Sequence, residues 1–186
     1  LSDLSQISET AADARARCPS VDVLINNAGI AYYGETAMMY AADAKRLLTI
    51  NLNAPIHLTR ELLPALLSQD EAHIVNVASF LGLIGTRRLS LYTASKFGLV
   101  GFSESLRAEY ARSGLGVTAM CPGFVDTRLF EAAPLGSDRE QPKLPPRWML
   151  TTPERIAKQA VRSIYRNRAL SVPQLYARLA YMGKRL

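Results

Sequence analysis

The hydrophobic residues of this chain fall into two patterns that alternate along its length. Short continuous apolar runs suit strands buried on both faces, and they occupy Val21–Ile25, Ile74–Ala78, Val117–Cys121 and, more weakly, Ala169–Val172. Apolar residues at helical spacing predict helices over 3–17, 38–68, 91–112, from 153 onward and from 175 to the last residue. Strands that alternate with helices predict an α/β fold with a parallel sheet.

The longer helices and one loop carry more detailed expectations. The helix over 38–68 is expected to bend near Pro55. The helix after Thr152 should bury an apolar stripe made of Ile156, Ala157, Ala160, Val161 and Ile164. The last helix should be amphipathic through Leu175, Leu179, Met182 and Leu186. Residues 128–150 have little periodicity and contain Pro134, Pro142, Pro145 and Pro146, which predicts a substrate loop or lid.

Composition and charge narrow the classes of function. The 186 residues fit one domain, and 48% apolar with 20% charged residues is a globular balance. The net charge of +6 is uneven, because residues 155–186 hold 8 Lys and Arg and no acid, whereas residues 1–154 hold 14 Lys and Arg against 16 Asp and Glu. Basicity therefore belongs to the C-terminal tail, and we expect no nucleic-acid partner. Arg178, Lys184 and Arg185 leave open an anionic membrane contact, a solvated face or a subunit contact.

The sequence also lacks the signs of secretion and of metal binding. No stretch approaches the roughly 18 apolar residues of a spanning helix, and no basic head precedes an apolar run near the first residues. Cys18 and Cys121 have neither metal-ligand nor disulfide spacing. We expect a reduced, cytoplasmic protein without a metal site.

The strongest chemical signal is Tyr92-Thr93-Ala94-Ser95-Lys96 at the start of the helix over 91–112. Residues four apart lie about 40° apart around a helix, so Tyr92 and Lys96 share a face. A phenol has a pKa of about 10, and an ammonium nearby favours the phenolate and lowers that pKa. The pair therefore suits proton transfer, although any long helix can carry such a pair on its surface.

Three further positions are candidate site residues because of where they lie in the predicted strands and helices. Ser79 ends a strand at the sheet edge where parallel sheets bind ligands, so its hydroxyl either holds a substrate oxygen or closes a turn. Asn51 lies mid-helix among apolar neighbours, and its amide either makes a structural hydrogen bond or serves a site. The run Asn26-Asn27-Ala28-Gly29 follows a strand, and its small residues would let a flat ligand approach the backbone.

Taken in order, these residues resemble the short-chain dehydrogenase/reductase family, of the kind with one dinucleotide-binding domain and a Ser–Tyr–Lys centre. The matching motifs are NNAG at 26–29, the helical Asn51, NVAS at 76–79, YTASK at 92–96 and PGFVDT at 122–127. The resemblance covers essentially the whole chain and is weakest beyond residue 128. It implies a doubly wound, Rossmann-type sheet with helices on both faces.

The resemblance also implies roles for the catalytic residues. Tyr92 would be the general acid and base of a reaction that interconverts a carbonyl and a secondary alcohol by hydride transfer. Lys96 would lower the pKa of Tyr92 and bind the nicotinamide ribose, and Ser79 would orient the substrate carbonyl. Asn51 would anchor a water in a proton relay from Lys96 to solvent.

The cofactor implied by the resemblance is NAD or NADP. Asn26, Ala28 and Gly29 would line it, together with Tyr92 and Lys96. The nicotinamide end would lie against a second group of residues, namely Pro122, Gly123, Val125 and Thr127. The resemblance further implies a homo-oligomer, formed through the helices over 38–68 and 91–112.

One departure from the family pattern is large. Members of the family open with a strand, a glycine-rich turn and a helix that bind the pyrophosphate, whereas the first glycine here is Gly29. About 60 residues, at roughly 30 for each βαβ unit, would be missing. We therefore expect a partial domain over 1–186, part of a longer protein, with Val21–Ile25 as an exposed edge strand and no productive cofactor binding by these residues alone.

The segments beside the expected site are apolar, which favours a hydrophobic ketone or alcohol as substrate, although ordinary core packing explains them equally well. They comprise Phe80, Leu81, Leu83 and Ile84, then Phe124, Leu129 and Phe130, then Trp148 and Met149. Two other functions stay open. One is a non-catalytic binding or assembly fragment of the same fold, and the other is a lyase or epimerase of the same family.

Overall fold

The computed structural model describes residues 1–18, 20–129, 133–136 and 145–184. Its sheet contains β1 (Val23–Asn26), β2 (Ala72–Val77), β3 (Leu115–Met120) and β4 (Leu170–Ser171), hydrogen-bonded in that order. All three neighbouring pairs are parallel, and Ile25, for example, lies opposite Val75. The prediction of an α/β fold with a parallel sheet is confirmed.

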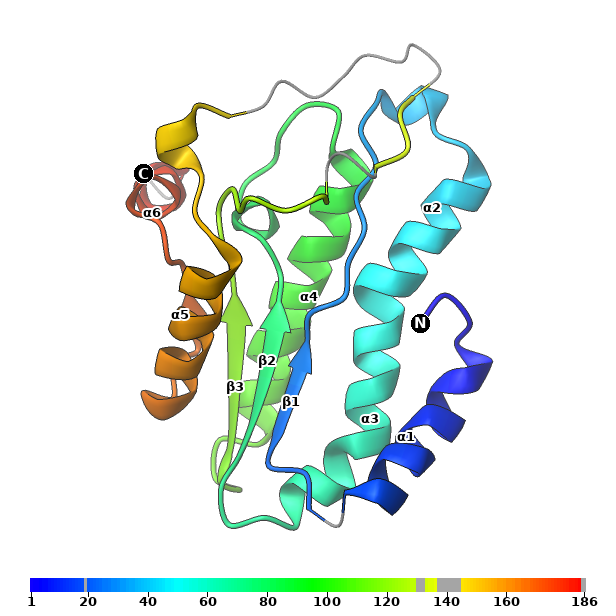
Figure 1. The fold of residues 1–186 in the computed structure, drawn as a ribbon, viewed down its shortest axis with the longest axis vertical. Coiled ribbons are helices and arrows are strands. Elements are labelled where there is room, and N and C mark those ends of the chain that lie inside the picture. The colour runs from blue at the N-terminus through cyan, green and yellow to red at the C-terminus, as the bar shows by residue number, and fades with distance from the viewer. Residues whose placement is uncertain (19, 130–132, 137–144, 185–186) are drawn as a thin grey trace.

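Six α-helices accompany these strands in the described part of the chain (Figure 1). They are α1 (Ser5–Arg17), α2 (Ala41–Leu48), α3 (Ala54–Leu67), α4 (Ser90–Glu109), α5 (Pro153–Tyr165) and α6 (Leu175–Lys184). Helices α3 and α4 pack on the strands, α1 packs on α3, and α5 contacts β2 and β3. In Figure 1, α4 lies behind the strands, while α5 and α6 lie beyond β3 on the side away from α1.

The main core fills the space between the sheet and the layer of α1, α3 and α4. One cluster of apolar residues lies between the strands and α1, α3 and the end of α4, and includes Leu24, Leu66, Ile74 and Val117. A second cluster surrounds the start of α4 near the carboxyl ends of the strands and includes Leu47, Leu81, Tyr92 and Leu99. This second cluster fixes the position of the residues that line the cavity described below.

The opposite face of the sheet is more open at β1. Leu24 and Asn26 point into the core, whereas Val23 and Ile25 are 44% and 51% exposed. Alternate residues of a strand point to opposite faces, so β1 buries one face only. Because β1 is also the first strand in the sheet order, the expectation that this apolar run forms a sheet edge is confirmed.

The long helical region departs from the prediction in where it is interrupted. The regular α-helix gives way to a π-helical turn over Thr49–Asn53, and Pro55 lies in the first turn of α3. Proline has no amide hydrogen, so it fits where the π turn interrupts the regular pattern of helical hydrogen bonds. The regular helix is thus interrupted just before Pro55, and the expected bend near that residue stays a prediction. The wider π turn contains Asn51, and such turns occur often at functional sites.

Two predicted apolar stripes do not cover a core. In α5 the only buried residue is Ser163, and Val161 is exposed. In α6 the buried residue is Ala177, whereas Leu175, Leu179 and Met182 are 58–69% exposed. Apolar periodicity identified both helices correctly, but α6 turns Ala177, Tyr176 and Tyr181 toward the core and leaves its aliphatic residues outside. Leu186 lies outside the described residues.

The proline-rich region is described only in part. Residues 133–136 run beside Tyr33, which pairs with Leu135 through a single bridge. A 3-10 turn at Arg147–Met149 precedes α5, and two other such turns occupy Thr36–Met38 and Phe80–Gly82. Phe130 and residues 137–144 lie outside the described residues. Across the described helices, none combines the length and the apolar character that crossing a membrane requires.

Candidate active site

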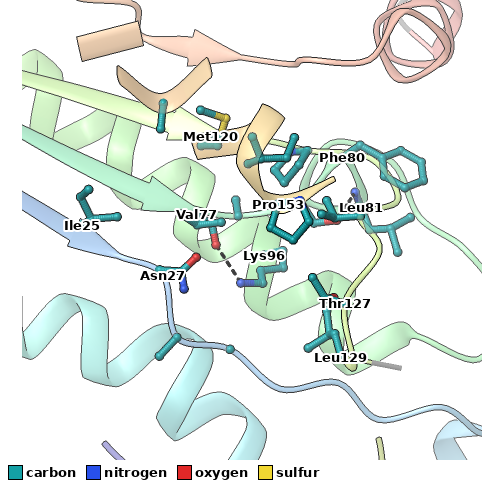
Figure 2. A pocket seen from close by; sticks show the side chains of 18 of the residues that line it. Ile25, Asn27, Val77, Phe80, Leu81, Lys96, Met120, Thr127, Leu129 and Pro153 are labelled. Atoms are coloured by element: carbon teal, nitrogen blue, oxygen red, sulfur yellow. Dashed lines mark hydrogen bonds between the residues drawn. The ribbon is translucent and has the colours of Figure 1, made fainter. Parts of the chain in front are cut away.

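A cavity of about 1040 Å³ opens at the carboxyl ends of β1, β2 and β3, between the sheet and α5 (Figure 2). Parallel sheets bind their ligands at this edge. Nine of the predicted site residues line the cavity: Ala28, Gly29, Ser79, Tyr92, Lys96, Pro122, Gly123, Val125 and Thr127. They come from the ends of three strands and the first turns of α4, so the fold brings together segments that are far apart in sequence.

Tyr92, Lys96 and Ser79 form the polar wall of this cavity. Tyr92 and Lys96 are each only 4% exposed. The Lys96 Nζ donates a hydrogen bond of 2.9 Å to the Val77 carbonyl, drawn in Figure 2, and lies 5.7 Å from the centre of the Tyr92 ring. The side chains of Ser79 and Tyr92 are hydrogen-bonded to each other, and the Ser79 hydroxyl also accepts from the Leu81 amide at 3.1 Å.

Burial dominates the protonation of this pair. It raises the pKa of the Tyr92 phenol to about 12, and the hydrogen bond with Ser79 offsets only part of that rise. Burial also lowers the pKa of Lys96 to about 8. The family resemblance implies a Tyr92 pKa lowered by Lys96. In this arrangement desolvation prevails and the pKa of Tyr92 is higher than usual, so the phenol is protonated at neutral pH.

Gly29 provides a close approach to Lys96. A Cβ at this position would lie 3.3 Å from the Lys96 Nζ and 3.5 Å from the Asn51 Oδ1. The chain after β1 therefore passes directly over two polar side chains, and residue 29 has little room for a side chain beside them. The bare backbone of this cradle also lines the cavity, where it suits a ligand that lies flat against backbone.

Asn51 lies beneath this cradle and does not line the cavity. Its Oδ1 accepts from the Ile30 amide at 2.8 Å, and its Nδ2 donates to the Ile30 carbonyl at 2.9 Å and to the Ser95 hydroxyl at 3.2 Å. The π turn thus uses a fully buried amide to hold the segment that follows Gly29 against α4. Of the two interpretations of Asn51, these contacts directly support the structural one.

Asn26 does not reach the cavity either. Its Nδ2 donates to the Thr59 hydroxyl at 3.1 Å and to the Asn76 Oδ1 at 2.8 Å, on the core side of the sheet. The prediction that Asn26 lines a cofactor is therefore not supported, and its neighbour Asn27 lines the cavity instead (Figure 2). The signal was available in the sequence, because alternation along β1 sends Leu24 and Asn26 to the same buried face.

The loop after β3 forms the wall opposite β1. Its Pro122 carbonyl accepts from the Phe80 amide at 2.8 Å, and the Asp126 amide donates to the Thr151 carbonyl at 2.9 Å. Gln174 and Tyr176, at the start of α6, bond to the backbone of Gly123 and Phe124. No sequence motif singled out these two residues.

Comparisons with known proteins match this arrangement. The family model described as "short chain dehydrogenase" matches residues 1–137, which is most of the chain. The chain belongs to the short-chain dehydrogenase family.

Two curated relatives and one solved structure give the extent of the similarity. Retinol dehydrogenase 10-A of Danio rerio is 39% identical over 158 residues, which cover 83% of this chain and 45% of that protein. Ketoacyl reductase HetN of Nostoc sp. is 34% identical over 167 residues, which cover 86% of this chain and 54% of that protein. The chain thus spans about half the length of these curated relatives.

The structural comparison extends beyond the region matched by the family model. A short-chain dehydrogenase from Sphingobium yanoikuyae, solved in complex with NADPH, is 26% identical with a TM-score of 0.79. The match covers 98% of this chain and 68% of that structure. The Rossmann-type arrangement expected from the motifs is therefore confirmed, and the similarity extends beyond the residues matched by the family model.

Proposed function

We propose that this protein is an NAD(P)-dependent oxidoreductase that interconverts a carbonyl and a secondary alcohol. The observation that carries the proposal is the meeting of Ser79, Tyr92 and Lys96 on one wall of the cavity. A surface Tyr and Lys four residues apart would be fully solvated, whereas these two are almost completely buried and face a space large enough for a ligand. The names of the two curated relatives support the same class of reaction.

The residues around Gly29 fit a nicotinamide cofactor. A ribose bound in the cavity would lie close to the Lys96 Nζ, beside Asn27, Ala28 and Gly29, which line the cavity with Lys96. Pro122, Gly123, Val125 and Thr127 would face the nicotinamide end from the opposite wall. When bound, the nicotinamide supplies the hydride. The NADPH complex of the Sphingobium relative supports this cofactor class.

The proton would be handled by the chain itself. With a pKa of about 12, Tyr92 holds its proton at neutral pH and can donate it to a carbonyl oxygen as that oxygen gains negative charge. Ser79, already hydrogen-bonded to Tyr92, would bind the same oxygen and stabilise its charge. The Lys96 ammonium would stabilise the phenolate that remains, and at a pKa of about 8 it is still mainly charged at neutral pH. Asn51 would act by fixing the backbone beneath the cradle.

We propose an apolar carbonyl compound or alcohol as the substrate. The residues that follow Ser79 and Gly123 present apolar side chains to the cavity, namely Phe80, Leu81, Phe124 and Leu129. Trp148, which the sequence grouped with them, is 75% exposed and does not line the cavity. We also keep two earlier expectations as proposals. One is a cytoplasmic protein. The other, from the resemblance, is a homo-oligomer formed through the helices over 38–68 (α2 and α3) and 91–112 (α4), which analytical ultracentrifugation tests.

The test of the function uses the native protein as its gene encodes it. Oxidation of NADH and NADPH is followed with a panel of apolar ketones and aldehydes, and the reverse reaction with the matching alcohols. Removal of a general acid costs roughly 10²- to 10⁴-fold in rate, so we expect a loss of that size in kcat for Tyr92→Phe. Tyr165→Phe is the matched control, since Tyr165 is 87% exposed on α5. Equal activity of Tyr92→Phe and the control would contradict the proposal.

A further inference from the structure

The start of α6 holds the loop after β3 by its backbone. The Gln174 Oε1 accepts from the Gly123 amide at 2.8 Å, and the Gln174 Nε2 donates to the Phe124 carbonyl at 3.4 Å. The Tyr176 hydroxyl accepts from the Phe124 amide at 2.6 Å. Two adjacent amides of a cavity wall are thus bonded to side chains from a helix some fifty residues later in sequence.

Aromatic packing reinforces this hold. The Tyr176 ring stacks on Phe124, with ring centres 6.4 Å apart and planes at 21°. It also meets the Phe80 ring edge-on at 6.1 Å. Phe80 and Phe124 both line the cavity. Tyr176 therefore joins the loop after β3 to the loop after β2.

The same contacts lead to the Ser79–Tyr92 pair. Pro122, which precedes the two held amides, accepts at its carbonyl from the Phe80 amide at 2.8 Å. Phe80 directly follows Ser79, whose side chain is bonded to Tyr92. A shift of Gly123 and Phe124 would move the Pro122 carbonyl and so release the backbone beside Ser79.

Tyr176 packs so closely against the loop after β3 that residue 123 has no room for a side chain. A Cβ built there would overlap the Tyr176 hydroxyl and lie 2.6 Å from the Tyr176 Cζ. The absence of a side chain at residue 123 is thus matched to the Tyr176 ring, which explains a glycine at this point of the loop on steric grounds.

We propose that Gln174 and Tyr176 are positioning residues of the active site, which fix the Pro122–Phe124 backbone and, through it, the Ser79 hydroxyl. Both lie beyond residues 1–137, the part that matches the family model. The effect on turnover rests on the proposed oxidoreductase function, whereas the effect on the backbone does not. This difference lets the two proposals fail separately.

The first experiment measures amide hydrogen exchange, resolved by residue with NMR, in Tyr176→Phe and Gln174→Leu. Tyr176→Phe keeps the ring and removes the acceptor, and Gln174→Leu removes the acceptor at Gly123. A hydrogen bond is worth about 0.5–1.5 kcal/mol, so we expect exchange at Gly123 and Phe124 to rise roughly 3- to 10-fold, and exchange at Phe80 to rise with them. Gln174→Glu, which retains an acceptor oxygen, should restore the Gly123 amide, and Tyr165→Phe should change none of the three.

Unchanged exchange at the Phe80 amide in both variants would overturn the proposal, because Gln174 and Tyr176 would then fix the loop after β3 without affecting the backbone beside Ser79. An equal rise across the whole chain would also overturn it, because it would indicate general destabilisation. In the native protein, both variants should lower kcat several-fold while the midpoint of thermal unfolding falls by only a few degrees, roughly 2–4 °C for each kcal/mol lost. An unchanged kcat would contradict the positioning role. If the unsubstituted protein turned over no carbonyl or alcohol, the oxidoreductase proposal would fail. The exchange rate of the Phe80 amide would still show whether Gln174 and Tyr176 fix the backbone beside Ser79.

Discussion

His73 on β2 should make the stability of the fold depend on pH. Its Nε2 lies 2.8 Å from the Thr118 Oγ1, and Thr118 donates its own proton to the Arg168 carbonyl at 2.6 Å. The Thr118 oxygen must therefore accept from an Nε2–H, which fixes the neutral tautomer of His73. Burial lowers the pKa of His73 from 6.5 to about 4, and the Arg107 guanidinium adds to the decrease.

The sign and the size of the effect follow from this shift in pKa. Between pH 6.5 and about 4, His73 is protonated in the unfolded chain but stays neutral in the folded chain. The free energy of unfolding therefore falls as the pH decreases through this window. The decrease of the His73 pKa from 6.5 to about 4 corresponds to about 3 kcal/mol at most. Between about pH 7.5 and about pH 4.5 the expected loss of unfolding free energy is about 2.5 kcal/mol.

The assay is urea unfolding at these two pH values, for the unsubstituted chain and for His73→Gln. The variant loses stability at both pH values because it disturbs the bond to Thr118, but it has no ring to protonate. Carboxylates with lowered pKa, such as Glu61, titrate in both proteins and cancel in the comparison. An equal loss of unfolding free energy in both proteins between the two pH values would mean that His73 does not cause the pH dependence.

Two further predictions concern the surroundings of Lys96 and the thiols. In the native protein, Gly29→Ala should raise the KM for the nicotinamide cofactor several-fold with little change in stability, because the new Cβ would lie 3.3 Å from the Lys96 Nζ. Gly101→Ala in α4 should leave that KM unchanged, because its new Cβ would meet no atom within 4 Å beyond its own stretch of helix. An alkylating reagent should modify Cys18 rapidly and spare Cys121 in the folded chain, because Cys18 is exposed while burial raises the pKa of Cys121 to about 12. Rapid labelling of both thiols under native conditions, read by mass spectrometry, would contradict the burial of Cys121.

Much of the fold could be predicted from the sequence because it depends on local patterns. The run Ile74–Ala78 is apolar on both faces, and such runs form strands buried on both sides, as β2 is. The helical spacing around Leu99 likewise predicted α4 to within three residues at each end. The sequence was ambiguous where one residue allows several structures at similar cost. Pro55 can end a helix, bend it or begin it, and only the tertiary structure placed it in the first turn of α3, after a π turn.

The candidate site divides in the same way. Tyr92 and Lys96 could be paired from the sequence, because helical geometry alone puts residues four apart on one face. The pKa of Tyr92 could not be predicted, since it depends on how much of the phenol is removed from water by distant segments. Asn26 and Asn27 are adjacent and chemically identical, and their different positions follow from the direction in which β1 turns its buried face.

By itself, the sequence determined the order of strands and helices, the Ser79–Tyr92–Lys96 set and the family. These follow from spacings of a few residues and from short motifs, which can be recognised without knowing how the chain folds. Only the tertiary structure decided that Gln174 and Tyr176 hold the loop at Gly123 and Phe124. Side chains fifty residues from their partners leave no periodic signal, because contacts of that kind arise when separate elements pack, and packing depends on three-dimensional shape.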